Sequence, residues 1–521
     1  MSAEGPTRVP VVIIGAGPTG VTAATLLAQY GVDCLILDRW SQVYRQPRAV
    51  HLDDEVFRIL ARLGIADEFE AISRPALGLR LVDANMTVLA EFARDTRLSR
   101  NGFPQANMFD QPDLEELLRA NLENYPRVEL RGDVEFTDLV EDGDGRVRVS
   151  YADRTDGSEH TVVADYVLGC DGANSVTRTR MGSRMQDLGF AQRWLVVDGA
   201  TTADLNQWDG VHQVCDQVRA GTYMRIADTR YRWEFRLLDG ETVADFDTPA
   251  KLAPLLKPWI DGTPCDDVEL VRVAEYTFRA QLADTWRRGP VFLLGDAAHL
   301  TPPFIGQGMG AGIRDAMNLA WKLAGVLDGS LPAEALDTYQ RERKSHSRSL
   351  IHEALGVGRV MTSGGQLGSL VRRVALPRLH RVPGVSARIL DSGTPALRRS
   401  ALNHTTRMPW HLAGTLCPNP VVDGDERLDA QLGRAFGVIT STAPRPMDRA
   451  LIARRGAVLH LAAPGTELAR WLHRGHASAA IVRPDRTVMT AGRDLAALCD
   501  VLPRSCPAPS RETVVPTRPT P

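Results

Sequence analysis

Two hydrophobic patterns alternate at the start of the chain, and together they predict a strand, a helix and a second strand. The run VPVVIIGAG at 9–17 is apolar and β-branched before glycine breaks it, as in a buried parallel strand. PTGVTAATLLAQYG at 18–31 has apolar residues at helical spacing and ends at Gly31, a suitable C-terminal cap. VDCLILDR at 32–39 is again strand-like. The pattern predicts a βαβ unit at residues 9–38.

The middle of the chain has a different pattern. GRVRVSYA at 145–152, RWLVVDGA at 193–200 and RYRWEFRLLDG at 230–240 alternate polar and apolar residues. This alternation predicts an antiparallel sheet with one exposed face. RGPVFLLGD at 288–296 returns to the buried-strand pattern. We therefore predict a parallel nucleotide-binding fold that a second sheet interrupts and that then resumes.

Three further segments follow. Residues 371–406 are rich in arginine, and we expect a helical linker there. Strand-like runs such as RAFGVITST and AVLHLAAPG, followed by the helix-like GRDLAALCDVL, predict a separate α/β domain at 407–503. The stretch 504–521 is rich in Pro and Thr and is expected to be disordered.

Composition narrows the classes of partner. The 521 residues allow roughly two to four domains, and the net charge of −3 offers no general basic surface for nucleic acid. No apolar run approaches the roughly 20 residues that span a bilayer, and the first residues lack the core of a signal peptide. The seven cysteines include no C-x-x-C pair and no zinc-type spacing. We expect a cytoplasmic protein with no metal site and with no nucleic acid or membrane partner.

A glycine motif lies between the first predicted strand and helix. Gly15, Gly17 and Gly20 form G-x-G-x-x-G, in which the glycines permit a tight turn, close approach of a pyrophosphate and helix–strand packing. The helix start adds free N–H groups and partial positive charge. Asp38 ends the second strand, where an acid can bond the ribose of a dinucleotide. The motif predicts dinucleotide binding.

A second glycine-rich loop decides between FAD and NAD. GDAAHLTPPFIGQGMGAG at 295–312 places glycines at the start of a helix, where each costs about 1 kcal/mol relative to alanine. The loop could serve tight helix packing alone. An extended ligand that touches both loops explains them better than a compact NAD half-site, because amides at this helix start can stabilise the anionic edge of reduced flavin by about 0.3–2 kcal/mol. The sequence favours FAD.

Three motifs in fixed order resemble those of the class A, single-component FAD-dependent aromatic hydroxylases. They are GAGPTG at 15–20, CDGANSVTR at 170–178 and GDAAHLTPPFIGQGMGAGIRDAMNLAWKL at 295–323. The resemblance implies an α/β fold in which an antiparallel-sheet substrate domain interrupts a Rossmann-like FAD-binding domain. A thioredoxin-like α/β domain, here without redox cysteines, would follow. The implied FAD contacts are Gly15, Gly17, Gly20, Asp38, Arg39, Arg48, Gln111, Asp171, Gly295, Asp296, Gly308, Met309 and Gly310.

The resemblance also sets expected domain boundaries. The FAD-binding domain would comprise 1–75, 100–190 and 281–370, and the substrate-binding sheet domain 76–99 and 191–280. The linker, the thioredoxin-like domain and the tail keep the boundaries given above. A homodimer is a further expectation.

The implied activity is hydroxylation of a phenolic aromatic substrate with NADPH or NADH and O2, through a flavin hydroperoxide. Within the family the chain is most similar to the 3-(3-hydroxyphenyl)propionate hydroxylases, which implies a phenylpropionate-like acid as substrate. Polyketide-tailoring hydroxylases share the same frame. The first alternative is therefore hydroxylation, epoxidation or Baeyer–Villiger oxidation of a polycyclic polyketide or antibiotic, and the second is a flavin-binding sensor that does not oxygenate.

Candidate residues for substrate chemistry are few. His51 follows Arg48 on the segment that lines the flavin in relatives, so it is our candidate for a base or a substrate hydrogen bond. A structural histidine near the cofactor is the alternative. His212, Tyr223 and Trp233 on the inserted sheet are candidate substrate contacts, unless they only pack within the sheet.

Overall fold

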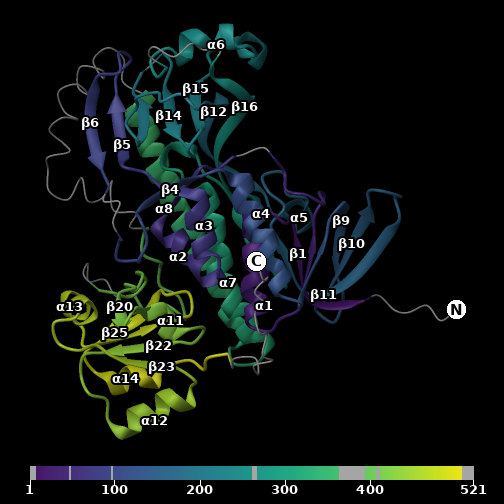
Figure 1. The fold of residues 1–521 in the computed structure, drawn as a ribbon. Helices are drawn as coiled ribbons and strands as arrows, with labels where there is room; N and C mark the ends of the chain where they lie inside the picture. The colour runs from purple at the N-terminus through teal and green to yellow at the C-terminus, as the bar shows by residue number, and fades with distance from the viewer. Residues whose placement is uncertain are drawn as a thin grey trace, which may run out of the picture.

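A mixed eight-stranded sheet forms one side of the computed structural model (Figure 1). β1 (Arg8–Ile14) runs parallel to β2 (Cys34–Leu37) on one side and to β11 (Glu159–Gly169) on the other. α1 (Pro18–Gln29) joins β1 to β2, which confirms the predicted βαβ unit. The sheet also contains β8 (Val128–Arg131), β9 (Val134–Glu141), β10 (Val147–Asp153), β17 (Arg287–Arg288) and β18 (Val291–Leu293). The structure describes residues 7–45, 48–94, 98–216, 218–260, 267–362, 394–405 and 411–506.

The strand expected at 145–152 joins this first sheet and not the second. β10 pairs antiparallel with β9 and with β11, so the hairpin extends the parallel strands at one edge. The expectation of one antiparallel sheet for all three alternating runs was therefore wrong for this run. Alternation reports which side of a strand is buried, but it does not identify the neighbouring strand.

The second sheet is mostly antiparallel, in the order β19-β16-β12-β15-β14-β13-β5-β6. Its long strands β12 (Met185–Ala200) and β16 (Glu269–Ala283) pair along most of their length. α6 (Pro249–Leu256) belongs to the hydrophobic cluster on one face, at the top of Figure 1. The other strands are β5 (Gly78–Val82), β6 (Val88–Ala93), β13 (Val211–Val214), β14 (Gly221–Arg225), β15 (Arg230–Arg236) and β19 (His299–Leu300).

A small sheet, β3-β7-β4, and several helices complete the part before residue 300. The strands are β3 (His51–Asp53), β4 (Ser73–Pro75) and β7 (Ala106–Phe109). The helices are α2 (Asp54–Leu63), α3 (Ala66–Ile72), α4 (Gln111–Asn121) and α5 (Val176–Arg180). Asp53 caps α2 by accepting a hydrogen bond from the Val56 N–H, and Gly64 ends the helix in a left-handed conformation.

α7 (Gly308–Leu327) is the central helix of the molecule (Figure 1). Every residue from 310 to 325 is buried, because α1, α2 and α8 (Asp337–Thr362) all contact it. A helix that is enclosed on all sides can keep charged side chains only where these are paired. Those pairs hold the site described below.

The C-terminal part has its own sheet, in the order β23-β22-β24-β25. β22 runs parallel to β23 and antiparallel to β24. The strands are β22 (Gly437–Thr440), β23 (Val458–Leu461), β24 (Ala479–Val482) and β25 (Val488–Gly492), with the pair β20 (Val421–Asp423) and β21 (Glu426–Arg427) beside them in sequence. The helices are α11 (Leu428–Leu432), α12 (Pro446–Arg454), α13 (Glu467–Arg474) and α14 (Leu495–Asp500).

Buried charges join the C-terminal part to the central helices. Glu342 of α8 accepts from Lys322 of α7 at 2.8 Å and from Arg483 at the end of β24 at 2.9 Å, and none of the three side chains is exposed. Trp321 packs edge-on against Phe436 nearby. Glu342 and Arg483 pair across the junction, so the junction is specific and not merely apolar.

The expected linker at 371–406 is described only in part. Residues 371–393 and 406 lie outside the described residues, as do 507–521 of the expected tail. Residues 394–405 contain no helix, which departs from the helical linker predicted there. Among the helices of the described residues, none is both long and apolar enough to cross a membrane.

Candidate functional site

A cavity of about 1620 Å³ lies where the first and second sheets meet. Ligand pockets commonly have about 300–1,000 Å³, so this cavity has room for a large ligand and a smaller one. Residues from the turn after β1, the end of β2, the start of α7 and one face of the second sheet line it. The two glycine loops that are far apart in the sequence therefore open onto one space.

The first glycine loop gives its three glycines different surroundings. Gly15 has φ of +104°, a backbone conformation that side chains disfavour. Gly17 caps α1 without a side-chain hydrogen bond, lines the cavity, and has no atom within 4 Å of where its Cβ would be. Gly20 does not line the cavity and is packed against the backbone instead. A Cβ there would lie 2.0 Å from the Gly15 carbonyl oxygen. Gly20 thus allows α1 to pack against β1, while Gly17 opens the helix start to a ligand.

Asp38 and Arg39 lie at the end of β2. Asp38 lines the cavity, and its carboxylate accepts from the Ala16 N–H at 2.5 Å and the Trp40 N–H at 2.8 Å. Arg39 also lines the cavity, and its guanidinium pairs with exposed Glu135 at 3.1 Å. Asp38 therefore connects the glycine turn after β1 to the chain that follows β2. Arg39 lies at the rim of the cavity.

Three further predicted residues line the cavity from separate segments. The Gln111 side-chain oxygen accepts from the N–H groups of Arg48 at 3.0 Å and Ala49 at 2.6 Å. The Arg48 side chain is exposed and lies over the Tyr44 ring, 5.7 Å from its centroid. Asp171 accepts from Ser175 Oγ at 2.5 Å and from the Thr177 N–H at 2.9 Å, so its carboxylate holds the turn before α5.

The second glycine loop ends at the start of α7. Gln307 caps the helix without a side-chain hydrogen bond, and Gly308 and Met309 line the cavity. A Cβ on Gly308 would have no atom within 4 Å. Gly310 does not line the cavity. A Cβ there would lie 2.9 Å from the side chain of Arg314 and 3.0 Å from that of Val56, so Gly310 permits close packing. The glycines of this loop thus serve both a ligand-facing helix start and close packing.

Side chains from the end of β3 and the first turn of α2 hold the start of α7. Asp53 accepts from Gln307 Nε2 at 2.9 Å and from the Arg314 guanidinium, whose Nε also donates to Glu55 at 2.7 Å. Burial would raise the pKa of Asp53, but the Arg314 charge and the Val56 N–H outweigh it, so the pKa lies below the ordinary value. The Asp53 carboxylate is therefore charged at neutral pH and fixes the first turn of α7.

A second carboxylate, Asp315 of α7, holds the loop that begins at Gly295. It accepts from the Gly295 N–H at 3.0 Å, from His299 Nε2 at 2.7 Å and from Arg343 Nε at 2.8 Å. Asp296 follows Gly295 and lines the cavity, and no hydrogen bond or ion pair joins its carboxylate to another described residue. Burial raises the pKa of Asp296, although His299 and Arg48 oppose this shift. Asp296 is thus an acceptor that is left open toward the cavity.

His51 lines the cavity from β3, next to Arg94. Arg94 Nη1 lies 3.3 Å from His51 Nε2, and because a guanidinium only donates, Nε2 is the acceptor and Nδ1 carries the proton. Nδ1 is buried without a hydrogen-bond partner. Burial and the Arg94 charge lower the pKa of His51 to about 4. His51 is therefore neutral at pH 7 and offers a donor at Nδ1.

His212, Tyr223 and Trp233 form consecutive cross-strand neighbours on β13, β14 and β15, but none lines the cavity. They are almost fully buried in the cluster beneath α6, where Tyr223 stacks on Trp259 at 6.0 Å. Successive side chains of a strand point to opposite faces, so the adjacent positions face the cavity instead. These are Gln213, Thr222, Met224, Arg232 and Glu234. The expected substrate contacts therefore shift by one residue along each strand.

Sequence reasoning missed two charged features of the cavity. Arg94 carries no helical or strand signal that would bring it to His51, because the contact spans 43 residues. Arg232 and Arg272 both pair with Asp198, at 2.6 and 2.7 Å, and both line the cavity. Only Arg232 and Asp198 had a readable signal, because both lie on strands that the alternating pattern predicts.

The groups around the cavity fit FAD. Two uncapped helix starts, at Gly17 and Gly308, present backbone N–H groups, which suit a pyrophosphate and an anionic ring edge. Asp38 and Asp296 supply acceptors for sugar and sugar-alcohol hydroxyls. Side chains at Gly17 and Gly308 would project into the space that such a ligand needs.

Comparison with protein families and sequences agrees with this fit. The model of a family described as "FAD binding domain" matches residues 8–354. A probable NADH-specific resorcinol 4-hydroxylase from Rhodococcus jostii (strain RHA1) is 33% identical over 531 residues, which cover 96% of each chain. A 3-(3-hydroxy-phenyl)propionate/3-hydroxycinnamic acid hydroxylase from Burkholderia cenocepacia (strain HI2424) is 33% identical over 446 residues, covering 84% of this chain and 80% of the relative.

Solved structures share the fold. Aklavinone-11 hydroxylase, in a ternary complex with FAD and aklavinone, matches with a TM-score of 0.79 and 24% identity over 96% of this chain and 99% of that one. The flavin-dependent monooxygenase PieE, in complex with FAD and substrate, matches with a TM-score of 0.77 and 23% identity over 95% and 99%. The likeness therefore extends through the C-terminal part.

Proposed function

Because the chain belongs to the FAD binding domain family, we propose that it is a FAD-dependent monooxygenase that hydroxylates a phenolic aromatic compound with NADH or NADPH and O2. Aromatic hydroxylases that are one third identical over most of both chains support this activity. The observation that carries the proposal is the opening of two uncapped helix starts onto one cavity. A plain NAD dehydrogenase would leave the second helix start without a role.

The chain's own residues bind FAD and orient it. Backbone N–H groups at Gly17 and the start of α1 hold the pyrophosphate, and Asp38 holds a ribose. Asp296 would accept from the ribityl chain, and the amides at Gly308 would stabilise negative charge on the ring. FAD, when bound, supplies the redox chemistry and activates O2. The apolar and aromatic side chains of the second sheet exclude water from the space that remains.

We propose that His51 acts through a hydrogen bond and not as a base. Its Nε2 lone pair already accepts from Arg94, and its pKa of about 4 leaves the ring neutral with the proton on Nδ1. A neutral imidazole in this tautomer can donate to a phenolic oxygen or to the cofactor but has no free lone pair for deprotonation. Arg94 and His51 together favour a developing negative charge in front of them.

The preferred substrate is a 3-(3-hydroxyphenyl)propionate-like acid. Arg94 supports this choice because, among the described residues, no ion pair joins it to a carboxylate. The charges of Asp53 and Asp54 act on Arg94, but neither carboxylate pairs with it, so its guanidinium can still bind an anionic group of a ligand. The amide 3-(3-hydroxyphenyl)propanamide has the same ring without the charge, and resorcinol has a second hydroxyl in place of the side chain.

The test uses the purified, FAD-loaded protein with these three compounds. We expect each turnover of the acid to consume NADH or NADPH and to place one atom of ¹⁸O2 in the product. Arg94→Gln should raise the KM for the acid by about tenfold or more, as expected for a lost charge-assisted hydrogen bond. It should raise the KM for the amide much less, because the amide loses only the orientation that Arg94 gives to His51. Arg80→Gln is the matched control, since Arg80 is on β5, pairs with Glu91 and does not line the cavity. Nicotinamide oxidation without hydroxylated product would contradict the activity, whereas equal KM effects on acid and amide would contradict only the substrate assignment.

A polycyclic polyketide is the second candidate, and the cavity volume of about 1620 Å³ favours it. Aklavinone-11 hydroxylase has the same fold, and its complex holds aklavinone. Product formed from a tricyclic or tetracyclic phenol, with none from the three small phenols, would select this candidate. A protein that binds FAD and oxidises no nicotinamide with any phenol would instead be a sensor.

We also propose a thioredoxin-like topology for the C-terminal part. The order β23-β22-β24-β25, with β24 antiparallel to its neighbours and a helix after each of β22, β23 and β25, supports it. None of the six described cysteines forms a disulfide, which supports a structural role and a reducing, cytoplasmic location. A homodimer remains a proposal from the family resemblance, and sedimentation of the holoprotein tests it. The domain boundaries predicted above are retained as proposals, which limited proteolysis tests.

A further inference from the structure

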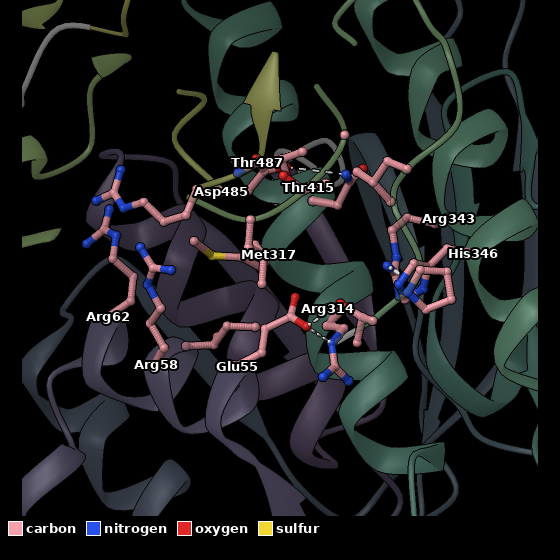
Figure 2. A pocket seen from close by; sticks show the side chains of 18 of the residues that line it. Glu55, Arg58, Arg62, Arg314, Met317, Arg343, His346, Thr415, Asp485 and Thr487 are labelled. Atoms are coloured by element: carbon pink, nitrogen blue, oxygen red, sulfur yellow. Dashed lines mark hydrogen bonds and ion pairs between the residues drawn. The ribbon is translucent and has the colours of Figure 1, made fainter. Parts of the chain in front are cut away.

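A second, smaller cavity of about 50 Å³ lies between α2 and the C-terminal part (Figure 2). Figure 2 shows Arg58 and Arg62 reaching into one end of it from α2, with Arg343 and His346 at the other end. Arg486, in the turn between β24 and β25, completes the lining at the junction. Arginines from two separate parts of the fold therefore face one small space.

The charges of Arg58, Arg62 and Arg486 are not balanced. Asp429 is the carboxylate they share, paired with Arg58 Nε at 2.6 Å and with Arg486 Nε at 2.8 Å. The Arg62 guanidinium donates to Gln29 Oε1 at 2.7 Å and lies beside the Tyr30 hydroxyl, and no ion pair joins it to any carboxylate of the described residues. Asp429 is thus the one described carboxylate that pairs with any of these three arginines, and Glu55 acts on Arg58 only from a distance.

The remaining acids of the cavity are already engaged. Glu55 accepts from Arg314 Nε at 2.7 Å and from Thr394 Oγ1 at 2.9 Å. Asp485 pairs with Arg483. The Tyr30 hydroxyl lies near Arg62 but donates to the Arg434 carbonyl, and burial raises its pKa, so it carries no charge. None of these groups offsets Arg62.

Several buried donors in the cavity wall also lack acceptors. Arg62 Nε and Nη2 and Arg486 Nη1 are buried and have no hydrogen-bond partner. Arg486 is 2% exposed and has φ of +66°, a conformation in which a side chain is disfavoured. Burial lowers the pKa of Arg486, and the charges of Arg62 and Arg58 lower it further against the effect of Asp429. Buried donors of this kind are destabilising unless an acceptor fills the space.

We propose that this cavity binds a small inorganic oxyanion of the phosphate type between Arg62 and Arg486. A tetrahedral oxyanion supplies acceptors and negative charge where both are missing, and arginine matches it with paired N–H groups. A buried water occupies about 10–15 Å³ of such space, so the cavity has room for one small oxyanion and not for a nucleotide. The anion joins α2 to the C-terminal part and is distinct from any substrate or cofactor of the larger cavity.

The experiment measures thermal unfolding of the FAD-loaded protein in rising phosphate, with chloride used to keep the ionic strength constant. FAD saturation prevents phosphate from acting at the pyrophosphate site. We expect a saturable rise of the Tm in the wild-type protein. Arg62→Gln should weaken phosphate binding by about tenfold or more, because two donors and one charge are lost. In chloride alone, Arg62→Gln should be at least as stable as the wild type, since it removes an unbalanced charge.

Arg474→Gln is the matched control, because Arg474 is an exposed arginine of α13 that does not line the cavity. It should keep the full phosphate response. A second readout is a crystal structure grown in selenate, in which anomalous density between Arg62 and Arg486 is expected. An equal phosphate response in Arg62→Gln and wild type, or an equal response to chloride, would overturn the proposal. So would selenate density that is absent from this cavity.

Discussion

The starts of α1 and α7 face the same cavity but are held in different ways. The start of α1 is positioned by its own backbone, since Gly15, Gly17 and Gly20 are within six residues of sequence and no side chain caps the helix. The start of α7 is positioned by side chains from elsewhere, and Asp53 reaches Gln307 across 254 residues. One helix start is therefore a local motif, whereas the other is a product of tertiary structure.

This difference predicts how each helix start fails. A local backbone motif tolerates a substitution only where the new side chain has room. A substitution that clashes should therefore prevent folding outright. A start that is held by buried ion pairs weakens in steps as each partner is removed. Variants at the two starts should therefore differ in whether folding or FAD affinity is lost first.

The largest expected effect is at Gly20. Gly20→Ala would place a Cβ 2.0 Å from the Gly15 carbonyl oxygen, which is backbone and cannot move cheaply. We expect a loss of more than about 4 kcal/mol in the free energy of unfolding, or no soluble protein. Gly17→Ala is the control, because its Cβ meets nothing within 4 Å. It should fold normally and bind FAD more weakly, as measured by flavin fluorescence; equal stability of the two variants would refute this account.

A smaller effect is expected at Asp53. Asp53→Asn removes the charge that pairs with Arg314, whose side chain is 3% exposed, and should lower the free energy of unfolding by about 3 kcal/mol. FAD affinity should fall as well, because Gln307 and the first turn of α7 lose their anchor. Glu55→Gln should cost less, since Asp53 still holds Arg314 and the Glu55 side chain is more exposed. Denaturant unfolding and FAD titration of both variants measure these losses. A larger loss of stability in Glu55→Gln would show that Glu55, and not Asp53, is the main anchor of Arg314.

The effect that is smallest at neutral pH concerns the pH dependence of stability. The pKa of His51 is about 4 in the folded protein and near 6.5 when unfolded, so the unfolded state binds the proton first as the pH falls. The stability of the wild type relative to His51→Asn should be constant above about pH 7 and fall by up to about 1.4 kcal/mol per pH unit between 6.5 and 4.

His212 is the matched control in that experiment, because it separates the effect of burying a histidine from the effect of losing a contact with the substrate. Burial also lowers the pKa of His212 to about 4, but His212 lies on the opposite face of the second sheet. His212→Asn should show a similar pH slope and leave the KM for the phenol unchanged, whereas His51→Asn should alter both. If His51→Asn left turnover unchanged across the pH range, the proposed hydrogen bond to substrate would be wrong.

The first helix start could be predicted from sequence because all of its physical requirements are adjacent along the chain. A β-branched run, three spaced glycines and Asp38 are sufficient to specify a strand, a turn and a helix. The second start could be located by its glycines but not explained. The pairing of Asp53 with Arg314 depends on how α2 packs against α7, and a single sequence contains no measure of that packing.

The substrate face shows a sharper limit. The expectation that the inserted sheet lines the cavity is met by β13, β14 and β15, but the side chains of His212, Tyr223 and Trp233 face away from the cavity. Their size instead filled the core beneath α6, and smaller or charged neighbours such as Thr222 and Arg232 face the cavity. Register is set by sheet pairing, so a shift of one residue exchanges the two faces.

The burial of Glu342 has a consequence for the chain as a whole. Its carboxylate is fully enclosed and is neutralised partly by Lys322 within the central helices and partly by Arg483 near the C-terminus. Removing the last hundred residues would take Arg483 away from Glu342 and uncover Trp321, which packs against Phe436, so the ends of the polypeptide should unfold together. A calorimetric trace of the intact chain should contain one cooperative peak, and a version shortened before β20 should fail to accumulate.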